Sequence, residues 1–160
     1  MCDFLYGAVS KKDYTKKFIT KSLEYNIPVT YTLESCTLFP LNKSNNDYIF
    51  FRLTNEYCDC STPLGYGSDN LQSEYLNIPK KRELFLNSIH NIIDNYINWL
   101  NELKNLCCIS NIYLLKHFDD NKPEKACTKY TVHVDDINRE FLINLENELA
   151  YKIQFYRKYY

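Results

Sequence analysis

The feature that most constrains the fold is a long apolar pattern at helical spacing between residues 79 and 106. One row of apolar side chains recurs every three or four residues: Leu86, Ile89, Ile93, Tyr96, Leu100 and Leu103. A second row lies one position behind it: Phe85, Ile92, Trp99 and Leu106. The two rows make an apolar face wider than a coiled-coil seam. Because Pro79 suits the first turn of a helix, the pattern predicts a helix over 79–106 that packs on a sheet.

Apolar or alternating runs on both sides of this helix predict strands over 3–9, 29–34, 48–53, 112–118 and 128–134. A first helix is expected to begin at Ser10, whose hydroxyl can accept a backbone amide, and to end near Tyr25. A last helix is expected from Asp135 to about Tyr156. The first six elements, β-α-β-β-α-β, predict one α+β domain over 1–160 with the ferredoxin-like arrangement. Its antiparallel sheet would carry both helices on one face, with a C-terminal β-α extension.

Composition and charge narrow the classes of partner. The formal net charge is −1, whereas nucleic-acid-binding domains are usually strongly basic. No apolar run approaches the roughly 20 residues that span a bilayer, and the first residues lack the basic region of a secretory signal. Seven cysteines without such a signal are expected to be thiols. We therefore expect a cytoplasmic protein without a nucleic-acid or membrane partner, whose fifteen tyrosines are compatible with a homo-oligomer.

The segment 58–67, here called the 58–67 loop, departs from the rest of the chain. It contains two of the three glycines, Gly65 and Gly67, which permit positive φ or a close approach of the backbone to a ligand. Its remaining candidate ligand-binding residues offer soft and hard donors: Cys58, Asp59, Cys60, Ser61, Thr62 and Tyr66. In the predicted fold the helix start at Ser10, a favourable place for an anion, would lie near this loop.

Three interpretations of the loop stay open. It could form the wall of a pocket for a small polar or phosphate-bearing ligand, although neither phosphate-binding glycine motif occurs. Alternatively, Cys58 and Cys60 could bind a metal or undergo redox chemistry. A zinc site would need two further ligands, drawn from His90, His117, His133 or another cysteine. In the third interpretation, the loop is a rigid turn with small buried thiols.

The N-terminus offers a different chemistry. The residues Met1-Cys2-Asp3-Phe4-Leu5-Tyr6-Gly7, followed by a predicted helix, resemble the opening of class II glutamine amidotransferases. The resemblance implies that Cys2, freed by removal of Met1, is a nucleophile that attacks an amide carbonyl. The His-Thr-Arg and His-Asn-Gly segments of that family have no counterpart in this chain. In the predicted sheet His117 and Asp119 would lie near Cys2 and complete a Cys/His/Asp set.

The sequence thus favours a cytoplasmic binding module that recognises a small polar ligand or a protein partner at the 58–67 loop and the Ser10 helix end. A protein that sequesters a ligand in a host–virus conflict would fit this description. The alternatives are an N-terminal-cysteine amidohydrolase that uses Cys2, and a cysteine-based metal or redox site. No residue pattern specifies a cofactor.

Overall fold

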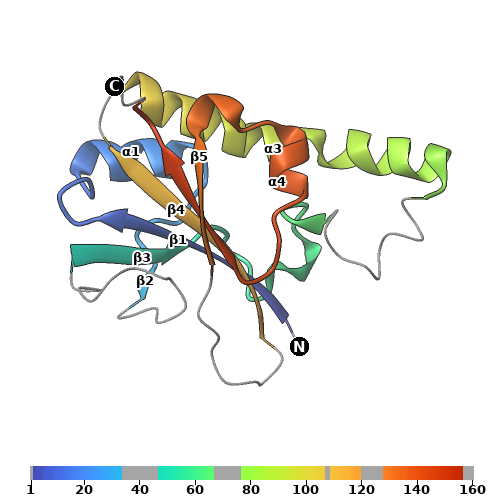
Figure 1. The fold of residues 1–160 in the computed structure, drawn as a ribbon, viewed down its shortest axis with the longest axis horizontal. Helices are drawn as coiled ribbons and strands as arrows, with labels where there is room; N and C mark the ends of the chain where they lie inside the picture. The colour runs from blue at the N-terminus through green and yellow to red at the C-terminus, as the bar shows by residue number, and fades with distance from the viewer. Residues whose placement is uncertain (1, 34–46, 67–76, 107–108, 120–127, 157–160) are drawn as a thin grey trace.

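The computed structural model describes residues 2–33, 47–66, 77–106, 109–119 and 128–156. Its centre is a six-stranded mixed sheet with the strand order β2-β3-β1-β4-β6-β5 (Figure 1). The strands are β1 Cys2–Ser10, β2 Thr32–Leu33, β3 Tyr48–Arg52, β4 Asn111–Asp119, β5 Thr128–His133 and β6 Leu149–Gln154. All neighbouring strands are antiparallel except β5 and β6, which are parallel. The described chain is therefore an α+β structure.

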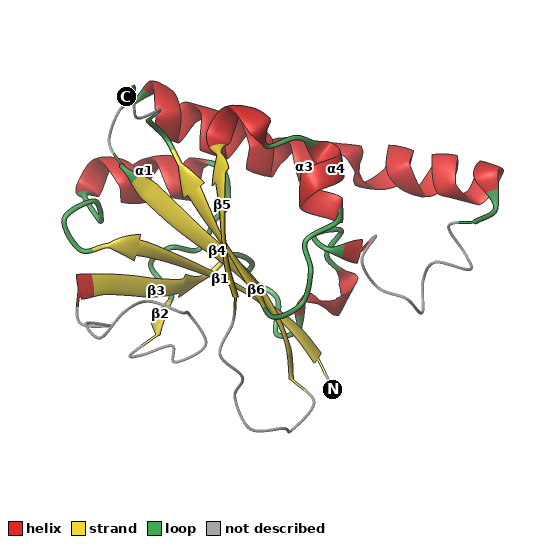
Figure 2. Cartoon of the chain, in the orientation of Figure 1, coloured by secondary structure: helices red, strands yellow, loops and turns green. Residues whose placement is uncertain are grey.

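Three α-helices of the described residues lie on one side of the sheet (Figure 2). They are α1 Lys16–Glu24, α3 Pro79–Asn105 and α4 Arg139–Ile143. The part of the chain that the structure describes also has two short 3₁₀ turns, η2 Asp59–Ser61 and η4 Val134–Asp136. None of the described helices is both long and apolar enough to cross a membrane.

Helix α1 begins later than the sequence predicts. Its N-cap is Thr15, whose hydroxyl accepts the amide of Phe18 at 3.3 Å. Ser10 instead ends β1, and its carbonyl accepts the amides of Asp13 and Tyr14 in a turn. The Asp13 carboxylate is buried and accepts the amide of Ser110 at 3.1 Å. Because a distant loop uses this carboxylate, Asp13 joins two segments and does not cap a helix.

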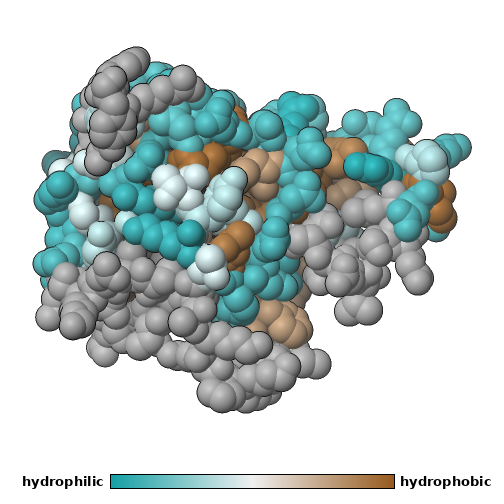
Figure 3. Space-filling model, in the orientation of Figure 1, coloured by the Kyte–Doolittle hydropathy of each residue, from teal (hydrophilic) through white to brown (hydrophobic). Residues whose placement is uncertain are grey.

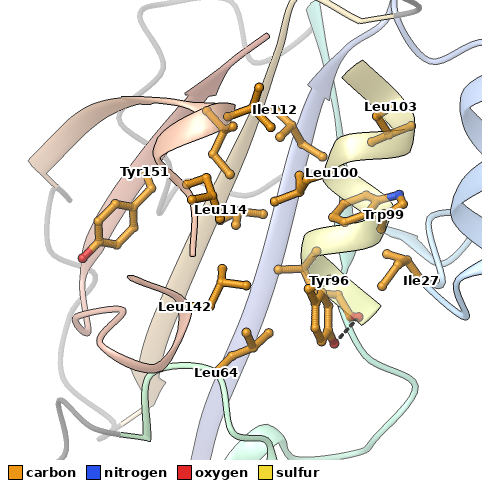
Figure 4. Packing of buried hydrophobic residues seen from close by; sticks show 14 of the residues in the cluster. Ile27, Leu64, Tyr96, Trp99, Leu100, Leu103, Ile112, Leu114, Leu142 and Tyr151 are labelled. Carbon is orange, nitrogen blue, oxygen red and sulfur yellow. Dashed lines mark hydrogen bonds between the residues drawn. The ribbon is translucent and has the colours of Figure 1, made fainter. Parts of the chain in front are cut away.

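The main core lies between the sheet and α3. Six residues of α3 are buried in it: Ile89, Ile93, Tyr96, Trp99, Leu100 and Leu103. Trp99 is fully buried, and its indole nitrogen donates to the hydroxyl of Ser22 in α1 at 3.0 Å. The Tyr96 hydroxyl donates to the carbonyl of Leu53 at 3.2 Å (Figure 4). The prediction that the long helix packs on a sheet is therefore confirmed.

The opposite face of the sheet has a smaller buried cluster. It consists of Ala8, Phe50, Tyr113, Leu115 and Ala150, each at most 3 % exposed. The apolar side chains of this cluster are therefore packed within the protein.

The ferredoxin-like prediction is wrong. The sheet has six strands, it is mixed, and a third helix accompanies it. The error lies in the predicted last helix, which is only the five residues of α4. Asn144 ends α4, Glu148 adopts a φ of +62°, and β6 then enters the sheet between β4 and β5. Apolar residues recur every four positions, at 137, 141, 145, 149 and 153, and so mimic a helix. Strand β6 instead places Tyr151 and Ile153 in the main core and Ala150 on the other face of the sheet.

Candidate functional site

The 58–67 loop completes an edge of β1 that β3 leaves open. Strand β3 pairs with β1 only over Tyr6–Ser10. Beyond that point the amide of Leu53 donates to the carbonyl of Leu5 at 3.0 Å, and the amide of Leu5 donates to the Asp59 carboxylate at 2.6 Å. The amide of Asp3 then donates to the Cys60 sulfur at 3.3 Å. Side chains of the loop thus satisfy backbone groups that a neighbouring strand would otherwise bond.

Asp59 is the anchor of the loop. It is 1 % exposed, and its carboxylate pairs with the Arg52 guanidinium at 2.7 Å and accepts the Thr54 hydroxyl. The Arg52 guanidinium also lies over the rings of Phe4 and Tyr6, at 5.1 and 5.7 Å from their centroids. Because a buried carboxylate needs such partners, Asp59 holds the loop in place and is not available to a ligand.

Cys58 and Cys60 lie on either side of Asp59 and are both free thiols. Cys58 is half-buried and its sulfur accepts the amide of Cys60 at 3.4 Å, while Cys60 is exposed. A hydrogen bond with the Cys58 thiol raises the pKa of Cys60, and the amide of Asp3 acts in the opposite direction. The Cys58 sulfur thus lies against the backbone of Cys60, and Cys60 itself is exposed.

The second half of the loop is packed against the protein. Gly65 has a φ of +73°; its amide donates to Leu142 at 2.8 Å and its carbonyl accepts the ammonium of Lys116 at 3.1 Å. A β-carbon at this position would lie 2.7 Å from the carbonyl oxygen of Leu145. Lys116 is only 2 % exposed and also lies 3.8 Å from the Asp3 carboxylate. Gly65 thus permits a close approach of its backbone to Leu145 and Lys116 of the same chain.

The remaining predicted residues of the loop fall into three groups. Thr62 is half-buried, and its amide donates to the carbonyl of Asp59 at 3.0 Å. Tyr66 stacks on Phe85 of α3 with 4.2 Å between ring centroids. The Ser61 side chain and Gly67 lie outside the described residues.

Ser10 is not near the loop. The loop contacts β1 at Asp3 and Leu5, whereas Ser10 ends that strand and pairs with Tyr48. At about 3.3 Å per residue, five to seven residues of extended chain separate the two places. The Ser10 hydroxyl is buried and has no hydrogen-bond partner in the part of the chain that the structure describes.

His117 on β4 pairs with Glu148. Its Nδ1 lies 2.8 and 2.9 Å from the two carboxylate oxygens, and one of these oxygens also accepts the amide of Phe118 at 2.9 Å. Both side chains are partly buried. The register pairs Phe4 with His117 and Cys2 with Asp119, so these four positions belong to one face of the sheet. The side chains of Cys2 and Asp119 lie outside the described residues, and the carboxylate on His117 comes from Glu148.

A groove of about 610 Å³ lies between the first half of α3 and α4. Its apolar lining includes Phe85, Ile89, Ile93 and Ile143, of which Ile89 and Ile93 are buried. Its polar lining consists of Asn77, Arg82, Asn87, His90, Arg139, Glu140 and Asn144. Phe85 connects the groove to the 58–67 loop, because Tyr66 stacks on it. Figure 3 shows apolar side chains, in brown, reaching the surface on the projecting half of α3.

The charged side chains of the groove are not equally available to a ligand. Arg139 binds the Asp94 carboxylate through Nε at 2.6 Å and Nη2 at 2.7 Å, and it also contacts His90. The guanidinium lowers the pKa of Asp94, and the carboxylate raises the pKa of Arg139. By contrast, Arg82 is exposed and forms no ion pair with any residue that the structure describes.

The sequence did not indicate this groove. Arg82 follows Lys80 and Lys81 and had the pattern of a solvated helix face, and Arg139 lay within a helix that was predicted too long. Glu148 was assigned to the same helix. Only the meeting of α3 with α4 brings Arg82 and Arg139 to one groove, and the helical spacing of Phe85 and Ile89 was the one usable signal.

Within the described ranges, no group of three or more His, Cys, Asp or Glu side chains is arranged to hold a metal ion. Comparisons with protein-family models, with curated proteins and with solved structures find no match to this chain.

Proposed function

We propose that the chain is a cytoplasmic binding module whose ligand occupies the groove between α3 and α4. The observation that carries the proposal is the groove itself. Its volume of about 610 Å³ is within the range of small-molecule sites. Buried isoleucines lie beneath polar side chains, which is the usual composition of such sites. The 58–67 loop contributes through Tyr66, which supports Phe85 from outside the groove.

The lining selects a small anionic ligand with an apolar body. Arg82 is the cation that carries no partner within the described residues, and a guanidinium binds carboxylate or phosphate through two parallel hydrogen bonds. The amides of Asn77, Asn87 and Asn144 add donors and acceptors at the rim. Phe85 and the isoleucines offer the apolar contact area.

Phenyl phosphate, which joins a ring to a phosphate, is a suitable probe. By the usual free energy per ligand atom, a molecule of this size should bind with a Kd on the order of 1 mM. Arg82→Gln should weaken binding about tenfold, because one charge-assisted hydrogen-bond pair is lost. Lys80→Gln, a matched change on the same exposed turn, should have little effect. Isothermal titration calorimetry measures both.

Glu140 provides the discriminating control. It is the acidic member of the lining that faces solvent, so a cationic probe of similar size would be drawn to it. Benzylamine should bind more weakly than phenyl phosphate. If benzylamine bound more tightly, or if Arg82→Gln and Lys80→Gln had equal effects, the proposal of an anionic ligand would be wrong.

A second candidate function is thiol-dependent amide hydrolysis by Cys2, and the His117–Glu148 pair favours it. A carboxylate on Nδ1 fixes the tautomer in which Nε2 can accept a proton. His117 Nε2 would take the thiol proton, the sulfur would attack the carbonyl, and the amine would leave with that proton. Water would then release the acid and restore the thiol.

The hydrolase candidate is tested with p-nitrophenyl acetate. A burst of nitrophenolate and an acetyl group on Cys2 are expected by mass spectrometry. His117→Gln should abolish the burst and Glu148→Gln should slow it about 10- to 100-fold, while the matched His133→Gln should leave it unchanged. Acetylation of Cys2 at the same rate in the His117→Gln variant would exclude His117 as the base.

A further inference from the structure

The two thiols of the 58–67 loop form a preorganised pair outside the groove. The Cys58 sulfur accepts the backbone amide of Cys60 at 3.4 Å, Cys60 is exposed, and Cys58 is half-buried. Cys58 is also the N-cap of η2, so its sulfur is directed at the start of that turn. Two adjacent, accessible thiols offer two soft ligands to one ion.

Each sulfur accepts one backbone amide. The amide of Asp3 donates to Cys60 at 3.3 Å, and the amide of Cys60 donates to Cys58 at 3.4 Å. Hydrogen bonds of this kind stabilise negative charge on sulfur, and they orient and tune the thiolates of metal centres. The backbone around the pair therefore already supplies the outer contacts that a bound thiolate needs.

The residue between the thiols keeps the pair rigid. Asp59 is buried and bonded to Leu5, Arg52 and Thr54, so the backbone of residues 58–60 is fixed to β1 and β3. The Arg52 guanidinium balances the Asp59 charge. Metal binding at a site that is already ordered does not require a costly rearrangement of the chain.

We propose that Cys58 and Cys60 form a two-thiolate site for a soft monovalent ion of the Cu⁺ class. Two thiolates complete the linear coordination that such an ion accepts, whereas zinc would require four ligands. Both thiols lose their protons on binding, so the thiols and one Cu⁺ become a complex with one net negative charge. The site is independent of the groove proposed for the small anionic ligand.

The test uses the reduced, full-length chain without oxygen, with Cu⁺ supplied as its coloured bicinchoninate complex. The wild-type protein should remove one Cu⁺ per chain from the chelator. Cys58→Ser and Cys60→Ser should each weaken binding at least tenfold, and the double variant should not compete. Serine retains an acceptor for each amide, and circular dichroism checks that the variants fold. The matched control is the double variant Cys107→Ser and Cys108→Ser, which removes two thiols adjacent in the sequence and should bind as the wild type does.

X-ray absorption of the one-to-one wild-type complex gives a readout that needs no variant. Two sulfur neighbours at one distance are expected around copper. A nitrogen neighbour, three sulfurs, or loss of binding in the 107/108 control would overturn the assignment. A protein lighter by two hydrogen atoms, with a disulfide between Cys58 and Cys60, would also overturn the assignment. It would show that the pair is oxidised and does not bind the ion.

Discussion

Asp59 joins three parts of the chain through one buried carboxylate. Its partners are the amide of Leu5 in β1, the guanidinium of Arg52 in β3 and the hydroxyl of Thr54. The sequence marked this residue as a candidate ligand because it lies between two cysteines in an unusual loop. Residue type alone does not distinguish a carboxylate that binds a ligand from one that caps a strand edge. The distinction depends on where β3 ends, because Asp59 bonds the part of β1 that β3 leaves unpaired.

Asp59→Asn should therefore destabilise the protein strongly. The substitution removes the charge that pairs with Arg52 and turns an amide NH₂ toward donors. The free energy of unfolding should fall by about 3 kcal/mol, the usual cost of breaking a buried ion pair from one side. Urea unfolding measures it. Glu56→Gln, an equivalent change at an exposed position of the same connection, should shift stability by less than about 0.5 kcal/mol. Equal effects of the two changes would show that Asp59 does not anchor the loop.

Among the secondary-structure elements, α3 was predicted within one residue and the last helix was predicted wrongly. Helix α3 has an apolar face long enough to exclude a strand. The C-terminal pattern is shorter. Apolar residues four positions apart are compatible with one continuous helix and equally with a short helix followed by a strand. The backbone at Glu148, with its positive φ, decides between them, and the residue type gives no sign of that conformation. The partners of β6 also lie far away in the sequence.

Helix α3 itself has two unequal halves. Figure 1 shows its N-terminal half extending beyond the sheet. In that half, residues 79–88 are exposed except for the half-buried Phe85, and the buried positions begin at Ile89. Amides of residues 83–88 should therefore exchange with deuterium at least tenfold faster than those of residues 96–103. Hydrogen exchange followed by mass spectrometry tests this, and equal protection along the helix would contradict it. Phenyl phosphate bound in the groove should slow the amide exchange of residues 83–88.

On the scale of the whole molecule, the two buried clusters on either face of the sheet contain tyrosines that do not ionise easily. Burial raises the pKa of Tyr96 well above its ordinary value of 10.0. Burial, with a hydrogen bond that the Tyr113 hydroxyl shares with Tyr48, raises the pKa of Tyr113 in the same way. The unfolded chain releases these protons near pH 10 while the folded chain retains them. The contribution of these two hydroxyls to stability should consequently be constant below that pH and should be lost as the pH rises above it.

Urea unfolding at pH 8, 10 and 11 tests this dependence. The free energy of unfolding should fall progressively from pH 10 upward, and tyrosinate absorbance should appear together with the loss of structure. Tyr96→Phe should make the fall less steep, although it costs about 1 kcal/mol at pH 8 through the lost hydrogen bond to Leu53. Tyr57→Phe, at a side chain that is 92 % exposed, should leave the slope unchanged. A stability that does not vary between pH 8 and 11 would contradict the burial of these hydroxyls.

The most direct test of the proposed function is a methyl NMR titration of the isoleucines with phenyl phosphate. The groove contains Ile89, Ile93 and Ile143, whereas Ile112 and Ile153 are buried in the sheet, outside the groove lining. Binding in the groove predicts saturable shifts of the first three δ1 methyl signals and little change in the other two, with the shifts reduced in Arg82→Gln. If no signal moves at millimolar probe, or if Ile112 and Ile153 shift more than the groove residues, the groove is not the binding site.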